Sequence, residues 1–331
     1  MTQLPSRLRL QMDEPNTVRL SNRVELPLMG IGTSLSDPNE KSKLYSAIQT
    51  AIHSGYRHID TAPVYGTEEI IGNALTDLYK ANKINRSDVF LTTKLPSYAN
   101  RPHIARQVLE KSLNNLKTNC LDLYLIHSPM SVKPNESTDD QLMDEQGRAI
   151  PDDVDLVETW RFMEEVCFDG KTRAIGLSNF NAKQVQQIYD AAEIKPHCLQ
   201  IELHLFLKQK ELVDLCRKLE IQVISYGTLG SPGRSLAKPG ITSVDCLKHQ
   251  LVIELSNKYG ITPAQVLLRH QIQNGIACIP KSTNTYRIRE NVRVLNFSIS
   301  KEDCERLNNE VNKEIRIFPC SKLKHHPNYP F

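Results

Sequence analysis

The sequence predicts an α/β protein of the (β/α)8, or TIM, barrel class. Short apolar or β-branched runs alternate with amphipathic stretches eight times, as expected for consecutive βα units. Several runs are almost continuously apolar, which is typical of strands buried on both faces of a parallel sheet. No G-x-G-x-x-G follows any of them, because Gly30-Ile31-Gly32 lacks the third glycine. A closed barrel therefore fits better than an open doubly wound sheet.

The eight expected strands are spaced along the whole chain. They cover residues 27–34, 56–60, 89–94, 121–127, 173–179, 198–203, 221–226 and 276–281.

The helices between them are marked by apolar stripes and by capping residues. Leu44, Ile48 and Ile52 recur at four-residue spacing, and Gly55 follows as a C′ residue. A second stripe ends at Gly170 and comprises Leu156, Trp160, Met163 and Cys167. N-caps are expected at Thr67, Asn181 and Thr262, with Pro263 as the first residue of its helix.

We expect one domain covering residues 1–331, since no linker, internal repeat or low-complexity tract interrupts the pattern. The segments 128–155 and 227–245 are longer than usual connections and are expected to be functional loops over one mouth of the barrel. Residues 312–331 contain three prolines and are expected to form a loop that covers the active site.

Composition excludes several classes of protein and site. The net charge of +3, without a basic run, argues against nucleic acid binding. Residues 1–16 lack the apolar region of a signal peptide, and no apolar run is long enough to span a membrane. The eight cysteines form no C-x-x-C pair, so we expect reduced thiols, no metal site and a cytoplasmic location. Without a long apolar seam or heptad, a monomer is expected.

Polar residues stand at the C-terminal ends of successive expected strands. They are Asp60, Lys94, His127, Ser178, Asn179, Gln200, Tyr226 and Lys281. Each alone has an ordinary explanation: an aspartate can cap a turn, a histidine can be a satisfied core residue, and a lysine can be solvated. In a (β/α)8 barrel, however, all these strand ends face the mouth that carries the active site.

Four residues of this region make a chemically coherent set. Tyr65 lies five residues after Asp60, in the loop that leaves the second expected strand. A phenol is a weak acid at neutral pH, but a nearby ammonium lowers its pKa, and Asp60 could hold Lys94 charged beside it. His127 could orient a substrate carbonyl or share its proton. A phenol with a tuned pKa suits carbonyl reduction, in which a hydride adds to the carbonyl carbon and an acid protonates the carbonyl oxygen.

The motifs HIDTAPVYGTEEIIGNAL, TTKL, LDLYLIHSP, AIGLSNFN and IPKSTNTYRIREN resemble those of the aldo-keto reductase family, in order and spacing, from about residue 17 to the closing HPNYP. The resemblance implies NADPH-dependent reduction of aldehydes or ketones to alcohols. It implies a catalytic tetrad of Asp60, Tyr65, Lys94 and His127, with Tyr65 as the general acid.

The resemblance also implies a cofactor site. Thr33 and Asp60 would approach the nicotinamide riboside, Tyr226 would stack on the ring, and Leu229 and Ser231 would contact the pyrophosphate. The carboxamide would be bound by Ser178, Asn179 and Gln200. The adenosine 2′-phosphate and adenine would be bound by Lys281, Ser282, Arg287, Glu290 and Asn291.

Charge supports the choice of NADPH over NADH. Lys281 and Arg287 place cationic donors beside an expected helix start, where hydroxyl and helix-end N–H groups add further donors to a phosphate. Without the other motifs, a solvated basic helix face would explain these residues equally well.

The substrate pocket departs from the aromatic-lined pocket of many relatives. Ser128 follows the catalytic histidine where an aromatic residue is common, and Pro96 stands where relatives carry tryptophan. Ser34 occupies a position where steroid-handling relatives often carry tyrosine. We assign Ser34, Val64, Pro96, His127 and Ser128 to the pocket and expect a weak grip on aromatic and steroid substrates.

Two alternative functions stay open at this point. One is a regulatory or structural protein that binds the cofactor with little turnover. The other is a lyase or isomerase in which Lys94 forms a Schiff base.

Overall fold

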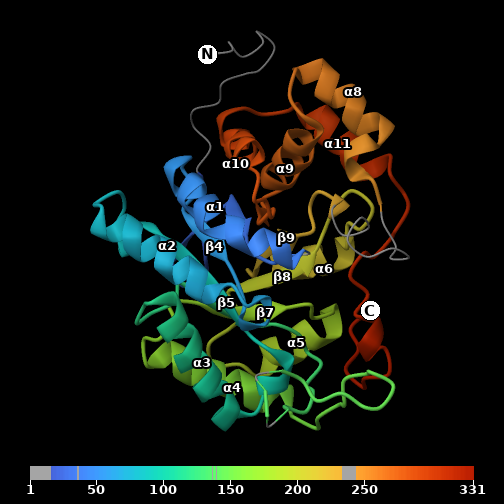
Figure 1. Cartoon of the computed structure of the whole chain (residues 1–331). Coiled ribbons are helices and arrows are strands. Elements are labelled where there is room, and N and C mark those ends of the chain that lie inside the picture. Colours follow the sequence, from blue (N-terminus) through green and yellow to red (C-terminus); the bar gives the residue numbers. More distant parts are fainter. Residues whose placement is uncertain (1–15, 36, 136, 139, 233–243) are drawn as a thin grey trace.

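Eight parallel strands form the barrel at the centre of the molecule, as Figure 1 shows. The computed structural model describes residues 16–331 except 36, 136, 139 and 233–243. The strands are β3 (Gly30–Gly32), β4 (His58–Asp60), β5 (Phe90–Leu95), β6 (Leu123–Ile126), β7 (Ile175–Ser178), β8 (Cys198–Glu202), β9 (Gln222–Tyr226) and β10 (Ala277–Cys278). Each pairs with the next along the chain, and each falls on one of the eight expected segments. The predicted (β/α)8 fold is confirmed.

The barrel closes where β3 meets β10. The backbone N–H of Cys278 donates to the carbonyl of Leu28 at 2.8 Å, and that of Gly32 donates to Pro280 at 3.2 Å. A Cβ atom at Gly32 would lie only 2.7 Å from the carbonyl oxygen of Ile279. Glycine is therefore required for the first and last strands to approach this closely.

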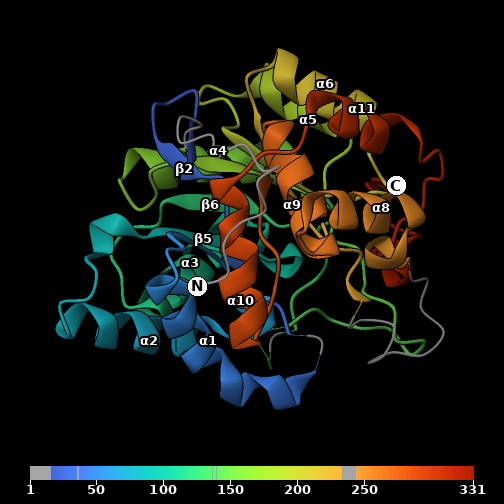
Figure 2. The same ribbon diagram turned by 90° about the horizontal axis from the view of Figure 1, so that it is seen from above.

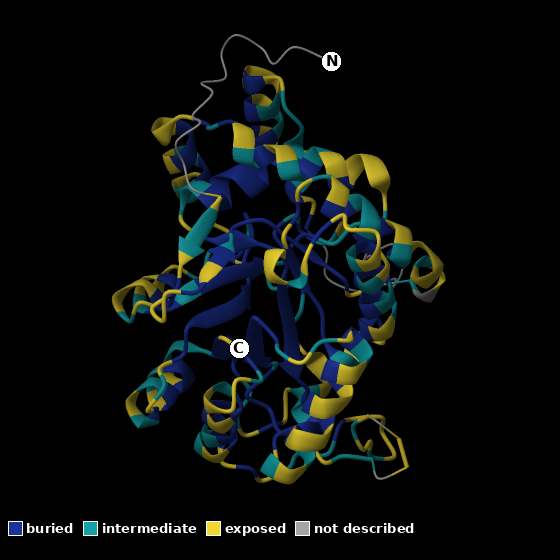
Figure 3. Ribbon diagram, turned by 90° about the vertical axis from the view of Figure 1, so that its left-hand side faces the viewer, coloured by how far each residue is buried: buried dark blue, intermediate teal, exposed yellow. Residues whose placement is uncertain are grey.

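Helices surround the barrel (Figures 1 and 2). They are α1 (Lys41–His53), α2 (Glu68–Lys80), α3 (Pro102–Leu116), α4 (Leu156–Phe168), α5 (Ala182–Ala191), α6 (Lys210–Lys218), α8 (Gln250–Tyr259), α9 (Pro263–Gln273), α10 (Thr285–Val292) and α11 (Lys301–Asn309). Figure 3 shows the resulting layers, with buried strands inside and alternating buried and exposed residues on the helices. The two expected stripes face the core, and Trp160 is 1% exposed.

All three expected N-cap residues stand at the N-cap position of a helix, and two of them also make side-chain capping hydrogen bonds. Asn181 and Thr262 each form a capping box, with Gln184 and Gln265 respectively. Thr67 is the N-cap residue of α2, but its side chain makes no capping hydrogen bond. Its hydroxyl instead lies 3.2 Å from that of Thr61 and 3.3 Å from that of Thr33, below the mouth of the barrel.

The structure contains elements that the sequence analysis did not predict. A hairpin of β1 (Thr17–Arg19) and β2 (Glu25–Pro27) precedes the barrel. Asn22 in its turn donates to the carbonyl of Arg173 at 2.8 Å, which ties the hairpin to the chain just before β7. Helices α8 and α11 are additional to the barrel helices and pack against each other and against α9 (Figures 1 and 2).

The long segments differ in how they are built. Residues 128–155 contain three antiparallel bridges, between Val132 and Pro151, Pro134 and Gln141, and Met143 and Ala149. Residues 233–243 of the second expected loop lie outside the described residues. Residues 312–331 run along one side of the molecule, in red in Figure 1, and contain only a short 3-10 helix, Ser321–Leu323.

The described helices include none that is long and apolar enough to cross a membrane. Of the eight cysteines, five are buried.

Candidate active site

A fully buried ion pair stands at the C-terminal mouth of the barrel. Asp60 ends β4, and Lys94 projects from the neighbouring strand β5. The Lys94 ammonium donates to Asp60 Oδ1 at 2.6 Å and to the carbonyl of Thr61 at 2.8 Å, and its side chain has no exposed surface. The second oxygen of Asp60 accepts a hydrogen bond from Gln200 at 2.7 Å. Burial of both charges is tolerable only because their hydrogen-bonding groups are satisfied in this way.

A tight turn brings Tyr65 over this pair. Residues Pro63–Tyr65 form a single 3-10 turn, and Gly66 ends it with a φ of 61°. Proline suits the start of such a turn, and a left-handed residue at its end favours glycine. The turn places the Tyr65 ring with its centroid 5.0 Å from the Lys94 ammonium.

His127 lies directly after β6 on the other side of the phenol. Its Nε2 atom is 3.4 Å from the Tyr65 hydroxyl, and the two rings meet edge to face. The backbone carbonyl of His127 accepts a hydrogen bond from Asn179 at 2.8 Å. The structure thus brings together all four residues of the predicted tetrad.

The electrostatics of the tetrad follow from burial and from the ion pair. Burial raises the pKa of Tyr65 above its usual value, and this outweighs the lowering effect of the Lys94 charge. The effect of burial on this phenol depends on the tertiary structure, whereas the sequence predicted only the effect of the charge. Burial opposes the charged form of Lys94, but the negative charge of Asp60 prevails and raises the pKa of the ammonium. Burial, with a smaller effect of Lys94, lowers the pKa of His127 to about 3, so the imidazole is neutral at physiological pH.

The residues assigned to the nicotinamide end also lie at this mouth. Asn179 has a φ of 63°, a conformation that asparagine tolerates better than most residues. Its Oδ1 atom accepts a hydrogen bond from the Tyr226 hydroxyl at 2.7 Å, and its amide donates to Ser178. Thr33 is fully buried and its hydroxyl donates to the carbonyl of Asp60 at 2.9 Å.

The residues assigned to the phosphate end lie after β10. Lys281 does not point freely into solvent, because it forms an ion pair with Glu40. Asn284 caps α10 by accepting the N–H groups of Tyr286 and Arg287, so these two helix-end donors are already bonded within the protein. Arg287 itself is exposed.

The residues assigned to the adenine lie on α10. Glu290 accepts a hydrogen bond from the Thr262 hydroxyl at 2.9 Å. Asn291 is 4% exposed, and its Oδ1 atom has no hydrogen-bond partner among the described residues. Buried polar atoms are rarely left in this state, so the oxygen has capacity for one further hydrogen bond.

The other predicted positions are spread over the loops. Leu229 and Ser231 follow β9, and Ser231 has a φ of 47°. Ser282 accepts the N–H of Asn284 at 3.1 Å. Of the residues assigned to the pocket, Ser34 and Val64 are exposed, whereas Pro96 and Ser128 are buried.

Comparisons with known proteins agree with this geometry. Residues 28–311 match the sequence profile described as the Aldo/keto reductase family. The chain belongs to the aldo-keto reductase family. It is 38% identical to rat aldo-keto reductase family 1 member C18 over 95% of this chain and 97% of the relative, and 38% identical, with the same coverage, to mouse estradiol 17 beta-dehydrogenase 5.

A solved structure shares the fold of this aldo-keto reductase. The aldose reductase from Schistosoma japonicum superimposes with a TM-score of 0.87 at 35% identity, covering 96% of this chain and 99% of that one.

One residue at the mouth of this aldo-keto reductase was missed by the sequence analysis. Glu202 ends β8, two residues after Gln200, and is completely buried. Its carboxylate accepts the backbone N–H groups of Ile317 at 2.6 Å and Phe318 at 2.9 Å, and lies 2.9 Å from Nε2 of His204. The signal was present, because a carboxylate stands at a strand end, but the tail residues that it binds lie more than a hundred residues later in the chain.

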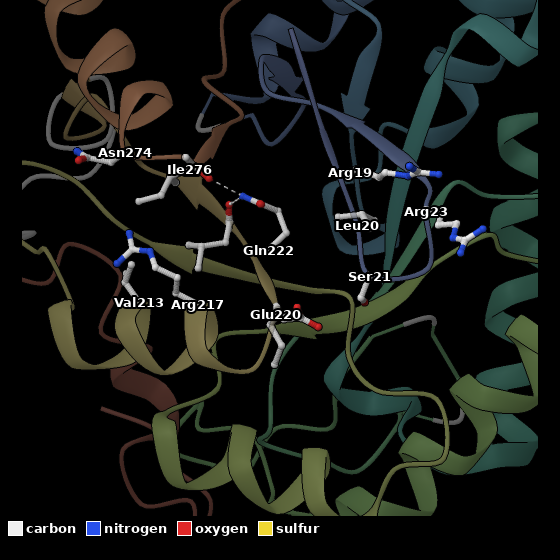
Figure 4. Close-up of a pocket in the computed structure, with 13 residues that line it drawn as sticks. Arg19, Leu20, Ser21, Arg23, Val213, Arg217, Glu220, Gln222, Asn274 and Ile276 are labelled. Atoms are coloured by element: carbon white, nitrogen blue, oxygen red, sulfur yellow. Dashed lines mark hydrogen bonds between the residues drawn. The ribbon is translucent and has the colours of Figure 1, made fainter. Parts of the chain in front are cut away.

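A pocket of about 520 Å³ lies at the opposite end of the barrel, between the N-terminal hairpin and the starts of β9 and β10. It is lined by three arginines, Arg19, Arg23 and Arg217. Figure 4 shows that Arg19 and Arg23 point away from Arg217 rather than toward a common centre. Arg217 also pairs with Asp214 at 2.9 Å. We therefore assign no chemistry to this pocket.

Proposed function

We propose that this protein is an NADPH-dependent carbonyl reductase that converts aldehydes or ketones to alcohols, with Tyr65 as the general acid. The observation that carries the proposal is the buried ion pair of Lys94 and Asp60 beside the Tyr65 phenol, with His127 Nε2 at 3.4 Å from the hydroxyl. Family membership establishes an oxidoreductase, and the arrangement of these four residues suits proton delivery to a carbonyl oxygen.

The residues present fit the proposed cofactor. The unpartnered Oδ1 atom of Asn291 could accept the amino group of an adenine, and Tyr226 offers a half-buried ring at the mouth for the nicotinamide. Ser178, Asn179 and Gln200 would hold the carboxamide, with Thr33 at the riboside. Leu229 and Ser231 would hold the pyrophosphate, and Lys281, Ser282, Arg287 and Glu290 the adenosine phosphate end. When bound, NADPH supplies the hydride that adds to the carbonyl carbon.

In this proposal, Tyr65 transfers its proton to the carbonyl oxygen as the hydride adds. The Lys94 ammonium stabilises the resulting phenolate, because it lies 5.0 Å from the ring centroid and is held in its charged form by Asp60. His127 is neutral and can position the oxygen through a hydrogen bond from Nε2. A neutral imidazole with a pKa near 3 is not a useful acid at pH 7, so the proton is assigned to Tyr65.

The same geometry argues against a Schiff-base mechanism. A Schiff base requires a neutral amine that the substrate can reach. The Lys94 side chain has no exposed surface, and Asp60 raises the pKa of its ammonium. A regulatory role without turnover has no specific support, because no residue of the tetrad is missing.

The pocket favours small polar or aliphatic aldehydes and dicarbonyls over steroids in this proposal. Ser128 and Pro96 provide no aromatic surface, and flat apolar ligands depend on such surfaces for affinity. Relatives at 36–38% identity include mouse estradiol 17 beta-dehydrogenase 5 and bovine dihydrodiol dehydrogenase 3. A substrate panel should therefore compare small aldehydes with the estradiol and dihydrodiol compounds that appear in the names of these relatives.

The proposal also covers the C-terminal tail, the oligomeric state and the location of the enzyme. Residues 312–331 would cover the mouth, since the tail is held by Glu202 and also by Gln184, which donates to the carbonyl of Asn328 at 2.9 Å. We further propose a monomer in the cytoplasm, in keeping with scattered cysteines that form no C-x-x-C pair.

The decisive experiment compares the wild type with Tyr65→Phe. The variant should lose carbonyl reduction by at least about 10²–10⁴-fold, the usual contribution of a general acid, while NADPH binding measured by fluorescence titration stays close to normal. Tyr286→Phe is the matched control, because Tyr286 is 82% exposed. Retention of most of the turnover number in Tyr65→Phe would remove Tyr65 from the mechanism.

A further inference from the structure

The lysine assigned to the 2′-phosphate already has an anionic partner within the chain. Lys281, after β10, forms an ion pair with Glu40, and the hydroxyl of Thr283 donates to the other oxygen of the same carboxylate at 3.0 Å. Both side chains of the ion pair are 29% exposed, so the pair lies at the surface where a ligand can reach it. The lysine of the expected phosphate site and the nearby Thr283 hydroxyl are therefore both bound to a carboxylate.

The Glu40 carboxylate is available to Lys281 and Thr283 because it makes no capping hydrogen bond to its own helix, although Glu40 is the N-cap residue of α1. The carboxylate instead reaches across to residues that lie more than 240 positions later in the chain. Burial opposes ionisation of Glu40, but the hydrogen bonds from Lys281 and Thr283 prevail and lower its pKa, so it is ionised at neutral pH.

We propose that Glu40 is a cofactor-discriminating residue, which competes with the adenosine 2′-phosphate for Lys281 and Thr283 and so narrows the preference for NADPH over NADH. The inference rests on the proposed function, since it concerns the same cofactor site. A 2′-phosphate must displace the carboxylate from Lys281 or accept a negative charge beside it, and either costs affinity. NADH carries only a hydroxyl at this position and meets neither cost.

The competition acts on only part of the phosphate site. Arg287 is exposed and is not an ion-pair partner of Glu40. The enzyme should therefore still prefer NADPH, through Arg287, but by less than two unopposed cations would give. The competition between Glu40 and the 2′-phosphate does not involve the tetrad. Proton transfer from Tyr65 should therefore be unaffected by the charge of Glu40.

The first test measures both cofactors by fluorescence titration on the wild type and on Glu40→Gln. Glutamine keeps the size and an acceptor oxygen but removes the charge. We expect the Kd for NADPH to fall about tenfold, equivalent to about 1.4 kcal/mol, and the Kd for NADH to change less than about twofold. The matched control is Asp37→Asn, which removes a charge from the same loop. Asp37 Oδ1 accepts the N–H of Asn39, and asparagine can preserve that bond.

A double-mutant cycle tests the pairing directly. Lys281→Met should weaken NADPH binding more in the Glu40→Gln background than in the wild type, because only there is the ammonium free for the phosphate. Weaker NADPH binding by Glu40→Gln would overturn the proposal and show that the carboxylate positions Lys281 for the phosphate. Unchanged affinities, or equal changes for both cofactors or for Asp37→Asn, would also overturn it. A wild-type protein that binds neither cofactor would instead refute the proposed function.

Discussion

The carboxylate of Glu202, at the end of a barrel strand, accepts the backbone N–H of Phe318 from the C-terminal tail at 2.9 Å. The Phe318 ring in turn meets the Tyr226 ring edge to face, with centroids 5.5 Å apart. Tyr226 is the residue assigned to the nicotinamide. A single buried carboxylate thus links the position of the tail to a ring of the proposed cofactor site.

Loss of this carboxylate should release the tail. In Glu202→Gln, an amide N–H₂ replaces one acceptor that faces a backbone N–H, and an unmet buried hydrogen bond costs about 1–3 kcal/mol. We expect faster proteolysis within residues 312–331 and a raised KM for substrate. Glu145→Gln, at an exposed loop position, provides the control. Wild-type proteolysis and kinetics in Glu202→Gln would show that the tail is held by its other contacts.

The pH dependence of reduction should depend on Lys94. The acid must be protonated, so the rate falls as pH rises through the pKa of Tyr65. Removal of the ammonium in Lys94→Met takes away the one nearby positive charge that lowers this pKa, so the alkaline limb should move to higher pH by one to three units in order of magnitude, and turnover should fall. Breaking a buried pair also costs about 3–5 kcal/mol of stability, so unfolding is measured in parallel. A folded variant with an unchanged pH profile and only a higher KM would make Lys94 a binding residue.

Arg287 should carry much of the preference for NADPH. Its planar guanidinium can grip two phosphate oxygens, and it is exposed to an incoming cofactor. Each charge-assisted bond contributes roughly 1.5–3 kcal/mol, so Arg287→Met should weaken NADPH at least about tenfold and barely change NADH. The preference should also shrink as salt rises. Fluorescence titration of wild type and variant with NADPH and with NADH measures both affinities. Equal losses of affinity for the two cofactors would mean that Arg287 supports the fold or contacts the adenine.

Substrate preference should change with the wall at Ser128. The side chain is 8% exposed and its hydroxyl accepts the N–H of Met130 at 3.2 Å. Ser128→Tyr should shift relative kcat/KM toward aromatic aldehydes, because an aromatic wall adds apolar contact. The wild type should prefer small aliphatic aldehydes or dicarbonyls. If steroid ketones gave the highest kcat/KM in the wild-type panel, this account of the pocket would be wrong.

Buried histidines should make the fold sensitive to acid. Burial lowers the pKa of His58 and of His270 to about 4 in the folded protein, against 6.5 as the ordinary value. The unfolded chain therefore binds more protons between these values, so stability is complete above pH 6.5 and is lost as pH falls toward 4. Each histidine contributes a slope of up to about 1.4 kcal/mol per pH unit. The free energy of unfolding, measured by denaturant titration at several pH values from 7 to 4.5, gives this slope.

His270→Gln is the variant that isolates one of these slopes. His270 Nε2 lies 2.8 Å from Oδ1 of Asn308, and glutamine can donate to the same atom without titrating. The variant should lose less stability than the wild type over the same pH range. Equal slopes for both proteins would assign the acid sensitivity to carboxylates instead.

The sequence by itself determined the barrel and the placement of Asp60, Lys94 and His127 at one mouth, because both follow from local patterns. Strand runs, capping residues such as Asn181 and the spacing of Asp60 and Tyr65 act over a few residues, and parallel strands necessarily bring their C-terminal ends to one mouth. The position of Lys94 at such an end was enough to predict its meeting with Asp60.

Only the tertiary structure decided which partners these residues have. The side chain of Thr67, the N-cap residue of α2, bonds to two other threonines and not to its own helix. Burial outweighs the effect of the Lys94 charge on the pKa of Tyr65. Glu40 binds Thr283, and Glu202 binds Phe318 of the tail, across more than a hundred residues of sequence. Such contacts depend on how helices and loops pack around the barrel, and no local pattern of residue types records them.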